Sequence, residues 1–137
     1  MTIIRSATPE DIGDVVELWD RAAGPSRQPG RHGEVERLIA HDPESLLIAE
    51  RDGCLLGTVI VGWDGWRCHL YRLAVDRSVR RSGMAGELMS EATARARRLG
   101  AGRLDAMVNF ENSQAIAFWE QLGFEFDPDD GRWSLPL

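Results

Sequence analysis

The hydrophobic positions of this chain change their spacing several times, and each change marks a predicted element. Apolar runs that alternate with polar residues or are continuous predict strands, whereas apolar spacings of three and four predict helices. Strands are therefore predicted over residues 2–7, 45–51, 54–63, 67–75, 103–108, 124–126 and 132–135. Helices are predicted over residues 9–22, 34–41, 83–99 and 113–122, with a polar loop over 26–33.

Three Asp-Gly pairs, at residues 52–53, 64–65 and 130–131, each lie between two predicted strands. This dipeptide between apolar runs is a strong hairpin signal, so the second, third and fourth strands are predicted to form an antiparallel meander. The fourth strand, the third helix and the fifth strand predict a right-handed crossover with parallel pairing. The chain is thus predicted to form one mixed α/β domain over 1–137, in the order β-α-α-β-β-β-α-β-α-β-β.

Composition narrows the function classes. The chain of 137 residues is long enough for a sizeable core, and its net charge of −6 argues against a general nucleic-acid binder. That charge weakly favours the approach of a cationic substrate such as an amine.

No apolar run approaches the roughly 18 residues of a membrane span, and residues 1–5 do not resemble a secretory signal. Cys54 and Cys68 form neither a disulfide framework nor a metal cluster, so we expect reduced thiols, no metal and a cytoplasmic location.

Candidate chemistry concentrates in the loop over 76–86, between a predicted strand and a predicted helix. Gly83 and Gly86 lack a Cβ atom, which allows a ligand to approach the main chain closely. The first N–H groups of a helix have no partner inside it and attract anions, and Arg80 and Arg81 add positive charge. These features suit a pyrophosphate, although an arginine-rich turn that only caps the helix would look the same. The loop carries neither the dinucleotide fingerprint nor a Walker A motif.

The pattern Arg80-x-x-Gly83-x-Ala85 resembles the coenzyme A pyrophosphate loop of the GNAT family of N-acetyltransferases. Residues 112–124 resemble a second segment of that family, Asn-x-x-Ala-x-x-x-Tyr-x-x-x-Gly-Phe, with tryptophan in place of the tyrosine. The predicted order of elements is also the family's and covers the whole chain. Residues 59–75 look like small bacterial members, YpeA-like or RimI-like. By these resemblances the chain is identified as a GNAT member.

The resemblance implies a sheet that splays between the fourth and fifth strands and holds acetyl-CoA in the resulting V. The main chain of the fourth strand would pair with the pantetheine amides, and the loop N–H groups would hold the pyrophosphate. Asn112 would face the pantetheine arm, cap the last helix, or do both. The implied cofactor-binding residues are Leu73, Ala74, Val75, Arg80, Arg81, Ser82, Gly83, Met84, Ala85, Asn112 and Trp119.

The family also implies direct attack of an amine on the thioester, assisted by a base on the fourth strand. His69 and Tyr71 lie in that region on one strand face, and a histidine has an ordinary pKa near 6.5, which suits a base. His69 could instead be a surface histidine, and Tyr71 a core residue or part of a pocket wall. Trp119 stands where many members have a tyrosine that protonates the leaving thiolate, a role that indole cannot fill.

Three functions follow as alternatives. The first is an acetyl-CoA-dependent N-acetyltransferase whose acceptor is a small-molecule amine, a peptide N-terminus or a lysine. The second is a non-catalytic acyl-CoA-binding regulatory or sensor domain, which Trp119 favours. The third is a phosphate-binding fold unrelated to coenzyme A, which the meander before the loop disfavours. Exposed late strands would favour a homodimer.

Overall fold

The computed structural model describes residues 1–22, 31–108 and 112–137, in two compact units, Met1–Ala106 and Met107–Leu137. The predicted end of the first helix after residue 22 and most of the predicted loop over 26–33 lie outside the described residues. The last two residues of that loop, His32 and Gly33, belong to a helix. The single domain over 1–137 stays a prediction.

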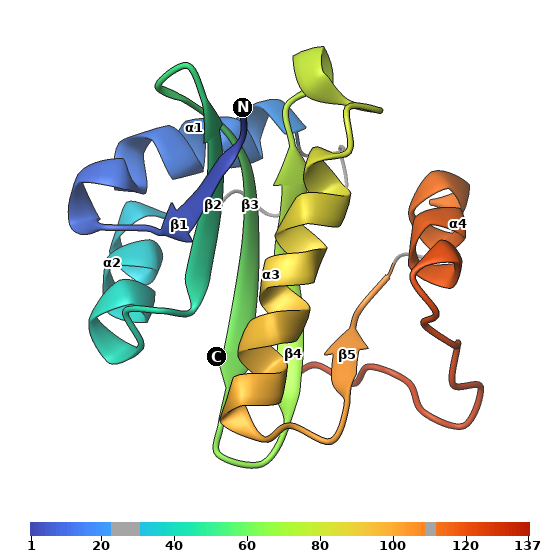
Figure 1. Cartoon of the computed structure of the whole chain (residues 1–137). Coiled ribbons are helices and arrows are strands. Elements are labelled where there is room, and N and C mark those ends of the chain that lie inside the picture. Colours follow the sequence, from blue (N-terminus) through green and yellow to red (C-terminus); the bar gives the residue numbers. More distant parts are fainter. Residues whose placement is uncertain (23–30, 109–111) are drawn as a thin grey trace. The chain divides into compact units, whose positions relative to one another are not determined.

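The larger unit is built on a five-stranded sheet whose strands lie in chain order (Figure 1). The first four strands pair antiparallel, and the fifth pairs parallel to the fourth. The predicted mixed sheet, meander and crossover are therefore confirmed. The strands are β1 Ile3–Ser6, β2 Leu46–Arg51, β3 Cys54–Trp63, β4 Cys68–Val75 and β5 Leu104–Ala106.

Helices cover both faces of this sheet (Figure 1). On one face lie α1 (Ile12–Ala22), entered through the 3-10 turn η1 (Pro9–Asp11), and α2 (His32–His41). α3 (Met84–Leu99) covers the other face. The core beneath α1 and α2 consists of Ala7, Ile12, Val15, Trp19, Val35, Ile39, Leu46, Ile48 and Ile60.

Gly57 on β3 explains why α3 packs so closely on the sheet. A Cβ atom built there would lie 3.0 Å from Leu88 Cδ1, 3.0 Å from Met84 Sδ and 3.4 Å from Ala49 Cβ. Real Cβ contacts almost never fall below 3.0 Å, so a larger residue would push the helix away. The helix buries Met84, Leu88, Ala92 and Ala96, which recur at helical spacing.

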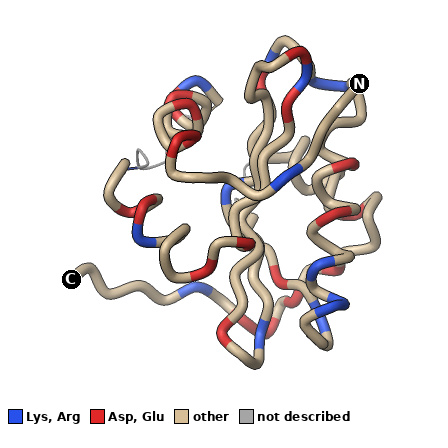
Figure 2. The backbone as a smooth tube through the Cα atoms, turned by 60° about the vertical axis from the view of Figure 1, so that its left-hand side comes forward, with Lys and Arg blue, Asp and Glu red and all other residues tan. Residues whose placement is uncertain are grey.

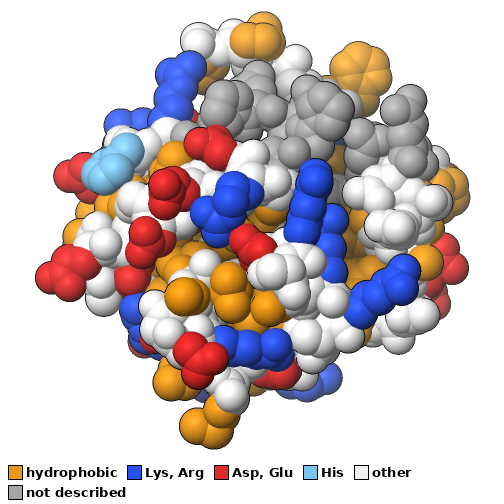
Figure 3. Space-filling model, turned by 90° about the horizontal axis from the view of Figure 1, so that it is seen from above, with side chains coloured by type: hydrophobic (Ala, Val, Ile, Leu, Met, Phe, Trp, Pro, Cys, Tyr) orange, Lys and Arg blue, Asp and Glu red, His pale blue; other side chains and the backbone are white. Residues whose placement is uncertain are grey.

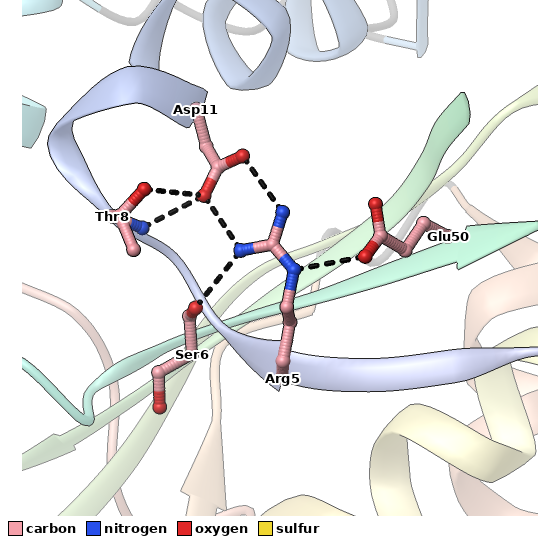
Figure 4. A network of polar contacts seen from close by, with 5 residues as sticks. All are labelled: Arg5, Ser6, Thr8, Asp11 and Glu50. Atoms are coloured by element: carbon pink, nitrogen blue, oxygen red, sulfur yellow. Dashed lines mark hydrogen bonds and ion pairs between the residues drawn. The ribbon is translucent and has the colours of Figure 1, made fainter. Parts of the chain in front are cut away.

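Arg5 joins β1, η1 and β2 through its guanidinium group (Figure 4). It donates from Nε to Glu50 at 2.8 Å and from Nη1 and Nη2 to the two oxygens of Asp11 at 2.8 and 2.9 Å. Asp11 also accepts from the backbone N–H of Thr8 at 2.8 Å. These bonds to Arg5 first, and then to Thr8, lower the pKa of Asp11 to about 2. The helical segment predicted to begin at residue 9 does begin there, and this start is also held by charge.

The two hairpin turns of the meander differ. Asp52 (φ 52°) and Gly53 (φ 76°) both have positive φ, which fits the two-residue turn predicted there. The second connection is instead a four-residue loop over 64–67, where the Asp64 carboxylate accepts from the backbone N–H groups of Trp66 and Arg67 at 2.8 and 2.7 Å. β4 consequently begins at Cys68, one residue later than predicted.

The smaller unit contains α4 (Ser113–Gln121). Asn112 caps this helix, since its Oδ1 accepts from the N–H of Ala115 at 3.0 Å. The strands predicted over 124–126 and 132–135 do not form among the described residues. The physical reason lies between them, where Asp127 accepts from the N–H of Asp129 at 2.9 Å within an exposed acidic turn that contains Pro128. Proline has no N–H to donate, and strands this short are not stable alone.

Candidate active site

β4 contains a bulge at Arg72. This residue directly precedes residues 73–75, which the family resemblance implies bind the pantetheine arm. Thr58 pairs with Ala74 and Ile60 pairs with Tyr71, so β4 has one residue more than β3 over this stretch. Arg72 takes up the extra length with a φ of 51°. Arginine rarely adopts positive φ, and nothing in the sequence predicts it here. A bulge bends a strand and redirects the backbone groups that follow it.

A buried relay of hydrogen bonds holds this bulge in place. Thr58 is fully buried and donates from its hydroxyl to the Arg72 carbonyl at 2.9 Å. The same hydroxyl accepts from the indole N–H of Trp19 at 2.8 Å. The Arg72 guanidinium in turn lies 4.9 Å from the centre of a Trp19 ring. Helix α1 therefore fixes the conformation of β4 at the bulge.

Beyond the bulge, one edge of β4 is open. The parallel ladder joins Cys68, His69 and Leu70 to β5 and then stops. Within the described part of the chain, no strand pairs with that edge over residues 71–75. The predicted splay between the fourth and fifth strands is therefore confirmed, because β4 pairs with β5 only over residues 68–70. Leu73, Ala74 and Val75 lie on the open stretch and are half-buried.

After β4 the chain enters the 3-10 turn η2 (Arg77–Val79), which Asp76 caps. One Asp76 oxygen accepts from the N–H and the hydroxyl of Ser78 at 2.9 and 2.7 Å. The other oxygen pairs with Arg21 of α1 at 3.1 Å. The bonds to Ser78, and then those to Arg21, lower the pKa of Asp76. The start of the predicted anion-binding loop is thus tied to α1.

The end of that loop offers an anion cradle. Arg81 and Gly83 have φ values of 65° and 88°, and α3 begins directly afterwards. Glu87 donates to the Gly83 carbonyl at 3.0 Å, whereas the N–H groups of residues 84–86 have no acceptor inside the helix. A Cβ atom built at Gly83 or Gly86 meets nothing within 4 Å, so the space beside them is open.

In the other predicted loop residues, two backbone amides are already hydrogen-bonded, whereas two arginine side chains are exposed. The N–H groups of Arg80 and Ser82 donate within the loop, to Arg77 and Val79 at 3.4 and 3.2 Å, so these two amides are already used. The side chains of Arg80 and Arg81 are exposed. The view in Figure 3, from above Figure 1, shows basic side chains with acidic ones among them. The open amides, the missing Cβ atoms and the two guanidinium groups fit a pyrophosphate.

His69 and Tyr71 line a pocket of about 350 Å³ between the end of α2 and the β3–β4 hairpin. Their ring centres are 6.2 Å apart, and His69 Nδ1 lies 3.9 Å from a carboxylate oxygen of Asp105 on β5. Gly62 makes room for the tyrosine, because a Cβ atom there would lie 3.3 Å from the Tyr71 ring. The structure thus brings the two predicted catalytic residues to one cavity. The pocket is lined by Leu38, His41, Asp42, Ser45, Gly62, Trp63, Asp64, His69 and Tyr71.

Arg95 of α3 supports the rim of this pocket. Its side chain is 5% exposed and donates to Asp42 at 2.7 Å and to Glu44 at 3.4 Å, so it ties α3 to the segment between α2 and β2. Its Nε atom has no hydrogen-bond partner. Arg95 and Asp42 were not predicted as site residues, and Asp64 was predicted only as part of a hairpin turn. Figure 2 shows acidic and basic residues interspersed along the described backbone.

Two predicted site residues, Asn112 and Trp119, belong to the smaller unit. Asn112 fulfils the predicted capping role. Trp119 makes edge-on ring contacts with Phe118 and Phe124, at centroid distances of 5.4 and 4.9 Å. Its placement against a pantetheine arm stays a prediction. Across the described ranges, no group of three or more metal-ligating side chains occurs, and no helix has the length and apolar character to cross a membrane.

Known proteins resemble this chain in sequence. A family model described as "Acetyltransferase (GNAT) family" matches residues 12–124. An acetyltransferase of Yersinia pestis strain Pestoides F is 33% identical over 124 residues, which are 89% of this chain and 86% of that protein. An acetyltransferase of Pectobacterium atrosepticum is 32% identical over the same shares of the two chains.

Solved structures share the fold at low sequence identity. Ard1 from Thermoplasma volcanium superimposes with a TM-score of 0.82 at 22% identity, covering 92% of this chain and 84% of that one. The ribosomal-protein-S18-alanine N-acetyltransferase of Escherichia coli gives a TM-score of 0.75 at 22% identity, covering 91% and 78% of the two chains.

Proposed function

The chain belongs to the GNAT acetyltransferase family, and on that premise we propose that it is an N-acetyltransferase that moves an acetyl group from acetyl-CoA to a primary amine. One observation carries the proposal: the open edge of β4 over residues 71–75 lies directly before the anion cradle of the loop and α3. A long donor with amide groups at one end and a diphosphate at the other needs these two features in that order.

The donor would be held mainly by backbone groups. Residues 73–75 would add the pantetheine arm to the sheet as a further strand. The N–H groups at the start of α3, with Arg80 and Arg81, would bind the pyrophosphate. Because neither interaction needs an ionisable group other than arginine, donor binding should change little with pH near neutrality. When bound, acetyl-CoA supplies an acetyl group that is activated as a thioester.

The acceptor must lose a proton before it can attack. A lysine-like amine with a pKa of about 10.4 requires roughly 4–5 kcal/mol for this at pH 7, whereas a peptide N-terminus near 8 requires about 1 kcal/mol. His69 is our candidate for the base, because it lies in the pocket beside the open edge of β4. Asp105, 3.9 Å from Nδ1, would favour the protonated ring that results.

Departure of the thiol needs less assistance. Trp119 has no acidic proton to give, and Tyr71 is the hydroxyl that lines the same pocket as His69. We assign Tyr71 the role of orienting a water molecule or protonating the thiolate. A thiol pKa near 8.5 makes unassisted departure tolerable, so loss of the Tyr71 hydroxyl should cost less than loss of the His69 imidazole.

A thiol-release assay over a panel of primary amines and peptides tests the proposal. We expect acetyl-CoA-dependent release of coenzyme A with an amine acceptor, together with a product that is heavier by one acetyl group. Tight coenzyme A binding without turnover on any acceptor would favour the non-catalytic acyl-CoA-binding domain. Replacing His69 and Tyr71 together separates the two functions, because an active parent with an inactive double variant excludes the sensor.

A further inference from the structure

We infer that the acceptor pocket selects a monoamine: one positive charge joined to a compact apolar body about the size of one aromatic ring. The inference rests on the proposed function and specifies its acceptor. It is carried by three properties of the pocket, namely its apolar wall, its charge balance and its position beside β4.

The apolar wall comes from Leu38 at the end of α2 and Trp63 at the end of β3. Both side chains are half-buried, so each keeps part of its apolar surface available to a ligand. The cavity volume of about 350 Å³ is at the lower end of the range for small-molecule sites. A ring-sized group fits such a space, and the two apolar side chains would cover it on binding.

The charge balance comes from two carboxylates that line the pocket. Asp42 is already compensated, because one oxygen accepts from Arg95 at 2.7 Å and the other from the N–H of Glu44 at 3.2 Å. Asp64 uses a single oxygen to accept from Trp66 and Arg67, and it forms no ion pair with any described residue. The backbone N–H groups of Arg67 and Trp66 lower the pKa of Asp64, which therefore stays ionised at neutral pH.

One uncompensated carboxylate matches one ammonium group. A polyamine would bring further charges with no carboxylate left to pair with them, and an acidic amine would be repelled by Asp64. His41 and His69 also line the cavity.

The position of the pocket would lead a bound amine to His69 and then to the donor. It extends from Asp64 past His69 to Tyr71, the first residue of the open β4 edge. An amine that enters at Asp64 would thus meet His69 before it reaches the donor. Asp64 attracts and orients the ammonium group, and His69 takes up its proton.

Steady-state thiol release tests the inference with 2-phenylethylamine, ethylamine, spermidine and glutamate as acceptors. Asp64→Asn keeps the turn, because an amide oxygen can accept the same two N–H bonds, but it removes the charge. We expect kcat/KM for 2-phenylethylamine to fall about tenfold while KM for acetyl-CoA stays within twofold. Trp63→Ala should reduce the preference for 2-phenylethylamine over ethylamine. Trp66→Ala is the matched control, since this tryptophan is 70% exposed and does not line the pocket.

Three kinetic results would overturn the inference. The first is that spermidine or glutamate is turned over better than 2-phenylethylamine. The second is full activity of Asp64→Asn, and the third is an equal effect of Trp63→Ala and Trp66→Ala. Calorimetric titration of 2-phenylethylamine into the coenzyme A complex covers the case of no turnover. Binding that Asp64→Asn weakens supports the inference, and absent binding refutes it. Failure to bind acetyl-CoA at all would refute the proposed function instead.

Discussion

Replacing Thr58 by valine tests whether the buried relay sets the shape of β4. Valine has nearly the same size and shape as threonine and suits a strand, so the change removes the hydroxyl and little else. The variant leaves the Trp19 indole N–H and the Arg72 carbonyl without the partner that both now have, at 2.8 and 2.9 Å. Trp19 is 5% exposed, so water does not replace that partner easily.

Most of the expected loss comes from the buried Trp19 N–H. A buried polar group left unsatisfied costs about 1–3 kcal/mol, the partly buried Arg72 carbonyl adds a smaller cost, and the added methyl group of valine offsets part of the sum. We therefore expect the free energy of unfolding to fall by about 1–3 kcal/mol. For a chain of this length each kcal/mol lowers the melting temperature by roughly 3–4 °C.

Urea denaturation and acetyl-CoA kinetics read out the two consequences. Thr58→Val should lower the unfolding midpoint and also raise KM for acetyl-CoA at a temperature where the variant is fully folded, because the relaxed bulge misdirects residues 73–75. Thr58→Ser is the matched control: it keeps the hydroxyl and loses one methyl group, so it should cost only about 1 kcal/mol and restore KM. A valine variant as stable as its parent, or a KM that does not separate valine from serine, would refute the reasoning.

Three further predictions concern the loop, the charge network and the base. Gly83→Ala should cost about 1–2 kcal/mol through its φ of 88° alone, and a coenzyme A titration should show weaker binding because the new methyl group enters the open space. Asp11, with a pKa lowered to about 2, stabilises the fold above the unfolded value near 3.8, and that contribution disappears as the pH falls from about 4 through 2. The Arg5 side chain is 37% exposed, so solvent screens its ion pair with Asp11, and the loss in free energy of unfolding should be about 1–2 kcal/mol. Urea unfolding midpoints measured at different pH values should show this loss in the parent but not in Asp11→Asn. His69→Gln should lower kcat by 10²–10⁴-fold for lysine-like amines and leave acetyl-CoA affinity unchanged in calorimetry; an equal loss of affinity would contradict a base role.

The elements that the sequence predicted well are those with a local signal. The run over 54–63 matches β3 at both ends, the Asp52-Gly53 turn has the expected positive φ values, and Thr8 and Pro9 begin the first helical segment. The sequence also predicted a loop between β4 and α3, where the structure has η2 and the start of the helix, whereas anion binding by this loop stays a prediction. In each case the residue types act on their own backbone or on near neighbours.

What the sequence did not predict depends on contacts between distant segments. Arg72 adopts positive φ because Thr58 and Trp19 hold its carbonyl and its guanidinium, and neither residue is near it in the chain. The pocket likewise collects residues from α2 and from the β3–β4 hairpin, which no periodicity connects. The prediction of two C-terminal strands was wrong. A short alternating run near the acidic turn at Asp127 forms a strand only if another strand pairs with it, and the run itself does not determine that pairing.

A crystal structure of this chain with coenzyme A tests the central claim most directly. We predict backbone hydrogen bonds from residues 73–75 to the pantetheine arm and a diphosphate seated on the amides at the start of α3. Coenzyme A bound elsewhere, or a strand of the same chain covering the edge of β4 beyond Leu70, would contradict it.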